Sequence, residues 1–115
     1  MVYCENDNEA LGAIEAIKEA GKIPGPDIKN GEILVVSFDG VNEKAIQCVL
    51  EGEIQCIAEC NPMQGSRVET VIELLESGKT PQKFSYVKED MYVHDNTVVS
   101  TAVDGTVYPV TVLTQ

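Results

Sequence analysis

Three short polar clusters contain most of the side chains in this sequence that could recognise a small ligand. Each follows a short apolar run: Glu5-Asn6-Asp7, Asp39-Gly40 and Cys60-Asn61-Pro62. Carboxylate and carboxamide groups offer fixed hydrogen-bond acceptors and donors, which suit a ligand rich in hydroxyl groups, such as a sugar. If the runs are parallel strands, all three clusters lie at one sheet edge, outside the carboxyl ends of the strands, where ligands of open α/β sheets bind.

The same residue types also occur for purely structural reasons. Asp and Asn side chains accept backbone N–H bonds at helix starts, so Asp7, Asn8 and Asn42 can be helix caps. Asp39-Gly40 can be a simple turn. Composition and spacing alone favour this structural interpretation over a ligand site.

Strand and helix patterns alternate along the first two-thirds of the chain. Strands are predicted at residues 2–4, 33–38 and 54–60, and helices at 8–20, 42–51 and 66–77. The run at 33–38 is apolar without alternation, which predicts burial on both faces. Ser66 and Glu69 fit a capping box in front of the third helix. The alternation predicts an α/β fold, a three-layer sandwich with a mostly parallel sheet.

The last third of the chain has a different pattern. Residues 84–93 are predicted to be extended, and residues 98–103 and 106–112 are β-rich runs. They flank Asp104-Gly105, a dipeptide favoured in tight hairpin turns. A β-rich C-terminal tail with a hairpin is therefore expected after the α/β part.

Composition excludes several classes of function. The 115 residues carry a formal charge of −11, which disfavours nucleic acid and anionic membranes as partners. No apolar run reaches the roughly 20 residues of a membrane span, and residues 1–4 lack the pattern of a secretory signal. Cysteines at positions 4, 48, 56 and 60 lack CxxC spacing, which favours buried structural thiols. A disulfide from one of the last two cysteines to Cys4 or Cys48 remains open.

Several longer segments resemble a known family. They are residues 2–14 (VYCENDNEALGAI), 16–28 (AIKEAGKIPGPDI), 35–40 (VVSFDG) and the pair Asn61-Pro62. In order and spacing they resemble the type I periplasmic sugar-binding proteins, above all the ribose- and galactofuranose-binding components of bacterial ABC importers. The likeness covers residues 2–97. It implies a division into a partial C-terminal lobe, residues 1–97, and a tail, residues 98–115.

The resemblance also implies a site and partners. In this family a monosaccharide lies between two similar α/β lobes and is handed to a membrane permease, and no cofactor takes part. By resemblance, Asn6 and Asp39 hydrogen-bond sugar hydroxyls. Cys60 stands where ribose-type members often have a glutamine, with Glu59 and Asn61 beside it, and Cys60 and Asn61 are the expected residues of the third ligand contact. The whole protein would be periplasmic or extracellular and anchored as a lipoprotein. Without the N-terminal lobe, we expect weak or absent sugar binding and self-association of the chain.

Other functions leave weaker traces in the sequence. An enzyme could use Asp7 and Asp39 as an acid–base pair or Cys60 as a nucleophile, but the lone His94 lies far along the chain. A metal would need Asp7, Asp39 and Glu59 to converge. A LacI-type transcription regulator shares the two-lobed core and would need a DNA-binding headpiece. We therefore expect a non-catalytic sugar-recognition module.

Aromatic residues add little to this prediction. Tyr86, Tyr92 and Tyr108 have ring faces that could stack on a sugar. Strand tyrosines more often cover the edge of a core, so the sequence assigns none of them to the ligand.

Overall fold

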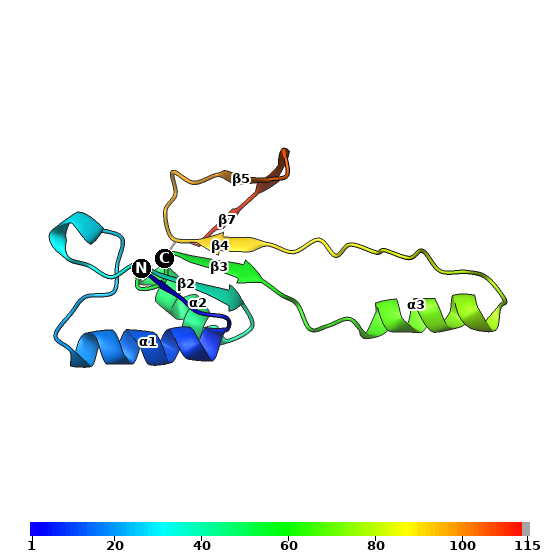
Figure 1. The fold of residues 1–115 in the computed structure, drawn as a ribbon, viewed down its shortest axis with the longest axis horizontal. Helices are drawn as coiled ribbons and strands as arrows, with labels where there is room; N and C mark the ends of the chain where they lie inside the picture. Colours follow the sequence, from blue (N-terminus) through cyan, green and yellow to red (C-terminus); the bar gives the residue numbers. More distant parts are fainter. Residues whose placement is uncertain (114–115) are drawn as a thin grey trace.

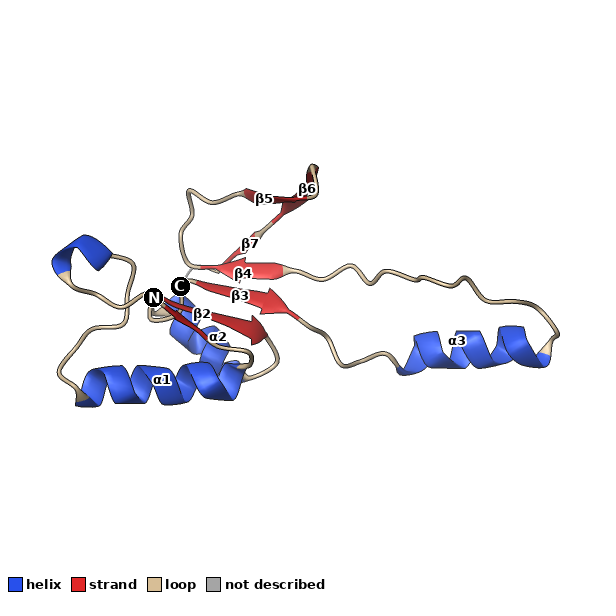
Figure 2. Ribbon diagram, in the orientation of Figure 1, coloured by secondary structure: helices blue, strands red, loops and turns tan. Residues whose placement is uncertain are grey.

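A five-stranded sheet forms the body of the protein, and the computed structural model describes residues 1–113 (Figures 1 and 2). The strand order is β1-β2-β3-β4-β7. The strands of this sheet are β1 (Val2–Tyr3), β2 (Val35–Asp39), β3 (Cys56–Glu59), β4 (Met91–Val93) and β7 (Thr111–Val112). The helices are α1 (Asp7–Glu19), α2 (Glu43–Leu50), α3 (Gly65–Glu76) and the 3-10 turn η1 (Ile28–Asn30).

The first three strands are parallel, and two helices connect them. Helix α1 joins β1 to β2, and helix α2 joins β2 to β3, with Val36 opposite Cys56 in the register of the second pair. Strand β4 then runs antiparallel to β3, and β7 runs parallel to β4. The predicted α/β class and mostly parallel sheet are confirmed. The carboxyl ends of β1, β2 and β3 consequently share one edge of the sheet.

A single apolar cluster joins the two helices to the sheet. Its largest fully buried side chains are Val35 on β2, Val49 on α2, Ile54 in the turn before β3, and Ile57 on β3. Helix α1 adds the apolar stripe Ala10, Ile14 and Ile17, which has the i, i+4, i+7 spacing of one helix face. Burial of this stripe against β2 and α2 is what holds α1 in place.

Strand β2 is not buried on both faces, so that part of the prediction is wrong. Val35 and Ser37 are buried, whereas Phe38 is 36% exposed and Val36 is half-buried. Within residues 1–113, α1 and α2 cover the face that carries Val35 and Ser37, through the shared cluster. The opposite face therefore keeps apolar side chains in contact with solvent.

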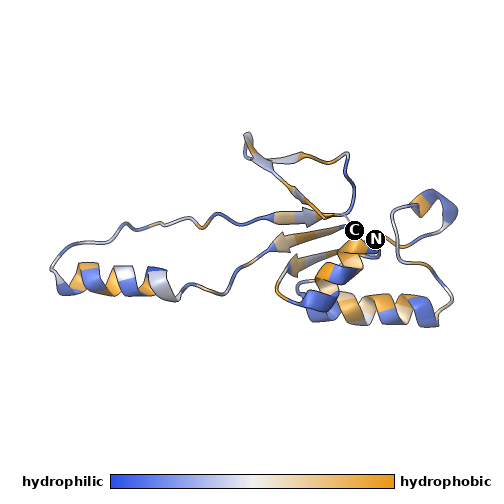
Figure 3. Ribbon diagram, turned by 180° about the vertical axis from the view of Figure 1, so that it is seen from behind, coloured by the Kyte–Doolittle hydropathy of each residue, from blue (hydrophilic) through white to orange (hydrophobic). Residues whose placement is uncertain are grey.

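Helix α3 lies apart from the body (Figure 1). The chain leaves the sheet after β3, forms α3 and returns in an extended segment to β4, so the molecule measures 61 × 29 × 25 Å. Figure 3 shows apolar residues along this helix. Four of them, at i, i+3, i+4 and i+7, are between 42% and 58% exposed: Val68, Val71, Ile72 and Leu75. The helix presents an apolar face that the described residues of the body do not cover.

The predicted capping box of α3 is wrong. The helix begins at Gly65, with Gln64 at the cap position and no side-chain cap bond. Ser66 therefore lies inside the first turn, where its carbonyl accepts a bond from the Thr70 hydroxyl. Propensity alone leaves an isolated helix of this length marginal, because most helical stability in proteins comes from tertiary packing.

The C-terminal tail contains a hairpin and a return to the main sheet. Strands β5 (Ser100–Val103) and β6 (Thr106–Pro109) pair antiparallel around Asp104-Gly105, both of which have positive φ, as this tight turn requires. Strand β7 then pairs with β4 at the edge of the main sheet. The division of the chain at residue 97 stays a prediction, and residues 114–115 of the predicted tail lie outside the described residues.

The cysteines are free thiols. Cys4 is buried, Cys48 and Cys56 are partly buried, and Cys60 is exposed. Burial raises the pKa of the Cys4, Cys48 and Cys56 thiols, with nearby carboxylates adding to the effect at the first two. The disulfide that the sequence left open is not formed. The prediction of buried structural thiols fits Cys4, Cys48 and Cys56, and it does not fit the exposed Cys60. No helix among residues 1–113 is long and apolar enough to cross a membrane.

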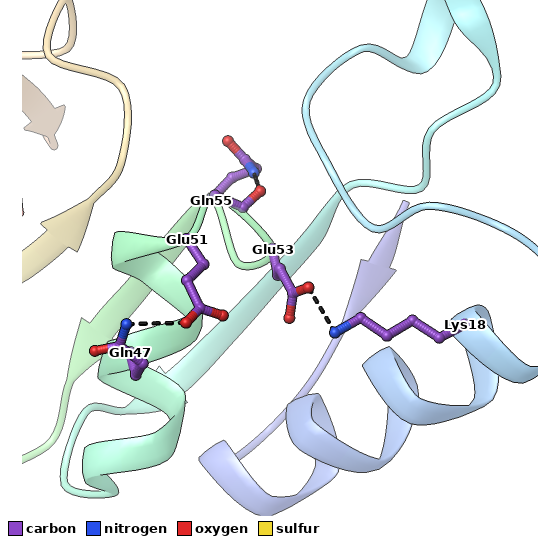
Figure 4. Close-up of polar contacts among 6 residues, drawn as sticks. Lys18, Gln47, Glu51, Glu53 and Gln55 are labelled. Carbon is purple, nitrogen blue, oxygen red and sulfur yellow. Dashed lines mark hydrogen bonds and ion pairs between the residues drawn. The ribbon is translucent and has the colours of Figure 1, made fainter. Parts of the chain in front are cut away.

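An ion pair between Lys18 on α1 and Glu53 ties α1 to the turn before β3 (Figure 4). The Lys18 Nζ lies 2.5 Å from the Glu53 Oε1, and the Lys18 side chain is 52% exposed. The hydrogen bond to Glu53 holds the pKa of Lys18 above its ordinary value of 10.5. A raised pKa means that the folded state binds the proton more tightly, so the pair adds stability below pH 10.5 and loses it as the pH rises through the folded pKa.

We expect Lys18→Met to lower the free energy of unfolding by only about 0.5 kcal/mol at neutral pH, because solvent screens exposed pairs. Urea unfolding at pH 7 and at increasing alkaline pH measures the effect, with the exposed Lys22→Met as the matched control. The difference between the variants should shrink above pH 10.5. A loss that persists there would show that it does not come from the charge of Lys18.

Candidate functional site

The predicted ligand residues of the first two clusters lie around one hollow at the carboxyl edge of the sheet. Its walls come from the start of α1, the end of β2 and the start of α2. The lining residues are Asn6, Asp7, Asn8, Glu9, Asp39, Val41, Asn42, Glu43 and Lys44. The sheet order brings residues more than 30 positions apart to this place, as the parallel-sheet argument predicts.

Asp7 supports the floor of the hollow. Its side chain is 3% exposed, and both carboxylate oxygens accept backbone N–H bonds from the loop after β2. Oδ1 lies 3.2 Å from the Gly40 nitrogen, and Oδ2 lies 2.8 Å from the nitrogens of Val41 and Asn42. Asp7 is therefore a clamp between α1 and the β2–α2 loop, and neither a helix cap nor a free catalytic acid.

Asn6 is the residue that caps α1. Its backbone is extended, and its Oδ1 accepts the Glu9 N–H at 2.9 Å. Glu9 reaches back, since its Oε2 accepts the Glu5 N–H at 2.8 Å. The prediction that Asp7 or Asn8 caps the helix is therefore wrong by one or two residues. The carboxamide Nδ2 of Asn6 is thus the group that can donate to a ligand, while the oxygen is already bonded.

Two asparagines fix the start of α2 beside the start of α1. Asn42 caps α2, because its Oδ1 accepts the Lys44 N–H at 2.9 Å. Its Nδ2 donates to the Asn8 Oδ1 at 3.0 Å. The structural interpretation of Asn42 is confirmed, and its amide bond to Asn8 sets the spacing of the two helix starts that frame the hollow.

Asp39 is the carboxylate of the hollow that carries strain in its backbone. Its φ is 97°, in a region that L-amino acids other than Asn and Asp rarely enter. Its carbonyl accepts the Cys60 N–H at 2.9 Å, which joins the ends of β2 and β3. Strain held in place by the surrounding structure is common at ligand sites, because it aims a side chain where a relaxed backbone would not.

The third predicted cluster lies next to this hollow but does not line it. Cys60 is exposed directly after β3 and is joined to Asp39 through its backbone. Asn61 uses its Oδ1 to accept the Met63 N–H at 2.9 Å, and its own N–H donates to the Glu89 Oε2 at 3.2 Å. The structure therefore brings Asn6 and Asp39 together and places Cys60 and Asn61 further along the same edge. The assignment of these four side chains to a ligand remains a prediction.

Acidic residues lie side by side at the ends of β2 and β3 and just before β4. Asp39 on β2 pairs with Glu59 on β3, and the Glu59 N–H donates to the carbonyl of Asp90, just before β4. Like charges on neighbouring strands repel each other. The row gives the edge a set of acceptors for hydroxyl groups, and it disfavours anionic ligands.

The metal and enzyme alternatives gain no support from the geometry. Among residues 1–113, no group of three or more His, Cys, Asp or Glu side chains is arranged to hold a metal ion. In the candidate pair of Asp7 and Asp39, both oxygens of the Asp7 carboxylate already accept backbone N–H bonds from the loop. The ring of His94 lies against Gly52, in the turn that leads into β3, and thus away from the edge that carries Asp39.

The fold and the position of the hollow are those of the open α/β class, in which ligands bind outside the carboxyl edge of the sheet. Comparison with known proteins narrows this class. No protein-family model matches the chain. The chain is 36% identical over 96 residues to the galactofuranose-binding protein YtfQ of Escherichia coli K12, covering 83% of the chain and 28% of that protein. It is 31% identical over 80 residues to the D-allose-binding periplasmic protein of the same organism, covering 68% and 23%.

A further relative and two solved structures agree. The fructose import binding protein FruE of Bifidobacterium longum is 27% identical over 83 residues, covering 72% of the chain and 23% of that protein. A Mycobacterium smegmatis protein solved with β-D-fucofuranose superimposes with a TM-score of 0.68 at 28% identity, covering 80% and 28%. A solved galactofuranose-binding protein gives a TM-score of 0.66 at 36% identity, covering 81% and 30%.

The chain is homologous to the C-terminal portion of the periplasmic sugar-binding proteins, which confirms the family resemblance found in the sequence. It spans less than a third of the length of the curated relatives it matches. All three curated relatives are named as sugar-binding or sugar-import binding proteins.

Proposed function

We propose that this chain supplies part of one lobe of the sugar-binding component of a bacterial ABC importer. The observation that carries the proposal is the hollow shared by Asn6 and Asp39 at the carboxyl edge of the sheet, in a chain homologous to furanose- and hexose-binding proteins. Carboxylate and carboxamide groups there can hydrogen-bond the hydroxyl groups of a monosaccharide. Cys60 and Asn61, at the same edge of the sheet, would add further ligand contacts. The protein would act without a cofactor and without catalysing a reaction.

A second wall is needed for tight binding. The hollow is open, and a sugar held on one side keeps much of its surface in water. The relatives are more than three times as long as the matched region, and the family resemblance assigns them a second α/β lobe. We propose that this lobe closes over the hollow and covers the exposed apolar face of α3. By itself the chain should bind sugars weakly or not at all.

The names of the relatives support a proposal for location and partner. One relative is named as periplasmic and another as an import protein, which favours a periplasmic sugar receptor over the LacI-type regulator as the alternative. We propose a membrane permease as the recipient of the sugar and a lipoprotein anchor for the whole protein. Studied alone, the chain should self-associate, because α3 exposes an apolar face. A concentration-independent monomer in light scattering would contradict self-association.

The experiment that tests the proposal compares the chain alone with a chimera. In the chimera, residues 1–97 replace the matching portion of the E. coli galactofuranose-binding protein. Melting temperatures are measured against a panel of pentoses and hexoses in furanose and pyranose forms. Ligand at about 100 times its Kd should stabilise the chimera by about 2.7 kcal/mol. A chimera that folds but is stabilised by no sugar would contradict the proposal.

The role of Asp39 is tested in the same chimera. We expect Asp39→Asn to weaken sugar binding by about 10- to 100-fold, because a charged acceptor for a sugar hydroxyl is lost. Calorimetric titration measures the change. Glu15→Gln is the matched control, because Glu15 is exposed on α1 and makes the same change of charge away from the hollow. Equal affinity of the Asp39 variant and the control would show that Asp39 does not contact the sugar.

A further inference from the structure

Tyr92 on β4 touches the loop that carries Asp39. It lies opposite Ile57 in the register of β3 and β4, and it packs against the edge of the core. A Cβ atom at Gly40 would lie 3.0 Å from the Tyr92 Cε2 and 3.5 Å from the Ile57 Cγ2. Gly40 has a φ of 70° and follows Asp39 directly. The tyrosine ring and the glycine backbone are therefore in close contact, behind the hollow.

Tyr92 and Glu59 occupy diagonal positions on the paired strands β4 and β3. Side chains of β3 and β4 that are diagonal neighbours on one face can interact, and Tyr92 and Glu59 have this relation. Burial raises the pKa of the Tyr92 phenol, and the carboxylates of Glu59, Asp90 and Glu89 and a hydrogen bond to Glu59 raise it further. The phenol stays protonated at neutral pH and can donate its hydrogen to the Glu59 carboxylate.

Glu59 in turn joins the two segments that lead to and from α3. Its Oε2 accepts the Asp90 N–H at 2.9 Å, and its own N–H donates to the Asp90 carbonyl at 2.9 Å. One step further out, the Asn61 N–H donates to the Glu89 Oε2 at 3.2 Å. The outgoing and returning segments are thus latched together by carboxylate–backbone bonds where they leave the sheet (Figure 1).

We propose that Tyr92 is a positioning residue that couples the Asp39 loop to the paired segments leading to α3, with its ring supporting Gly40 and its hydroxyl holding Glu59. The proposal rests on the proposed function in one respect only, namely that the Asp39 loop contacts the sugar. In that case, a movement of the loop on ligand contact is transmitted through the tyrosine ring to the bonds between Glu59 and Asp90. A change in those bonds in turn alters the orientation of the Asp39 side chain.

A double-mutant cycle on this chain tests the coupling without any sugar. Amide hydrogen exchange is followed by NMR in the unchanged chain, Glu59→Gln, Tyr92→Phe and the double variant. The informative amides are Asp90, bonded to Glu59, and Val41 and Asn42, bonded to Asp7. Exchange at the core residue Val49 corrects for changes in global stability.

We expect Glu59→Gln to speed exchange at Asp90 by about fivefold, because a neutral acceptor is weaker than a charged one. It should also speed exchange at Val41 and Asn42 by about twofold, and this second effect should vanish in the Tyr92→Phe background. Tyr108→Phe, on the exposed hairpin, is the matched control and should change neither site. An effect of Glu59→Gln on the loop that is absent, or equal in both backgrounds, would overturn the proposal.

Sugar titration of the chimera separates this proposal from the proposed function. If Tyr92→Phe weakens sugar binding by about threefold and the cycle shows coupling, both proposals stand. If the cycle shows coupling but no chimera binds sugar, the coupling holds and the proposed function fails. If the chimera binds sugar and the cycle is additive, the function holds and Tyr92 is not a positioning residue.

Discussion

Asp7→Ala should lower the free energy of unfolding by about 3 kcal/mol, because three backbone N–H groups lose their charged acceptor in a buried position. The donors belong to Gly40, Val41 and Asn42, so the whole loop between β2 and α2 is released at once. Domains of this size are commonly stable by only about 5–15 kcal/mol, so the loss would be a large share of the total. The loss is measured by urea unfolding, with the same dependence of the unfolding free energy on urea concentration used for both proteins.

Two further variants show whether the clamp is responsible. Asp7→Asn keeps the size and one oxygen but places an NH2 group among the donors, so we expect a loss of about 2 kcal/mol. Asn8→Ala removes an exposed neighbour with one side-chain bond and should cost about 0.5 kcal/mol. Equal effects of the Asp7 and Asn8 substitutions would show that the loop is held by packing and not by the carboxylate.

The role of Asp7 could not be predicted from the sequence. Its three partners lie 33 to 35 residues away, and their backbone N–H groups leave no mark in residue type. The sequence did show a polar residue in the first turn of a helix after a short strand, which fits a cap as well as a clamp. The signal that favours the clamp is the Gly40 that follows Asp39, because a positive φ lets the loop turn its N–H groups toward one acceptor.

The order of elements was predictable because periodicity is a local property. Strands and helices of the β1-α1-β2-α2-β3 region fall within a few residues of their predicted places, and the shared edge of Asn6 and Asp39 follows from parallel topology alone. Burial was harder, because it depends on which elements reach a face. The apolar run of β2 reads as doubly buried, yet Phe38 is partly exposed where the described residues bring no helix over it.

Helix α3 is a second case in which the sequence pattern does not tell what covers an apolar face. Its apolar stripe was read correctly as one helix face, but a stripe does not say what it packs against. In the described residues the stripe meets solvent, and the segment after the helix returns to the sheet without bringing it back. The proposed second lobe would cover this stripe, and the difference between α3 and the core can be measured directly.

Ile57→Ala should destabilise the chain by about 3 kcal/mol, because it leaves a cavity at a side chain that is 0% exposed. Ile57 also lies behind Gly40, beside Tyr92, so the variant should loosen the Asp39 loop as well. Ile72→Ala is the matched control, since it deletes the same atoms from a side chain that is 48% exposed on α3. In the chain alone, at a concentration too low for self-association, it should cost about 0.5 kcal/mol or less by urea unfolding.

The contrast between the two isoleucines should shrink in the chimera with the second lobe. If that lobe covers α3, Ile72→Ala becomes a core substitution there and should cost about 2 kcal/mol or more, while the cost of Ile57→Ala stays the same. Thermal and urea unfolding of both variants in both proteins gives the four numbers required. A cost for Ile72→Ala that remains small in the chimera would show that the second lobe leaves α3 exposed, whereas a large cost in the chain alone would place the helix against a second copy of the chain.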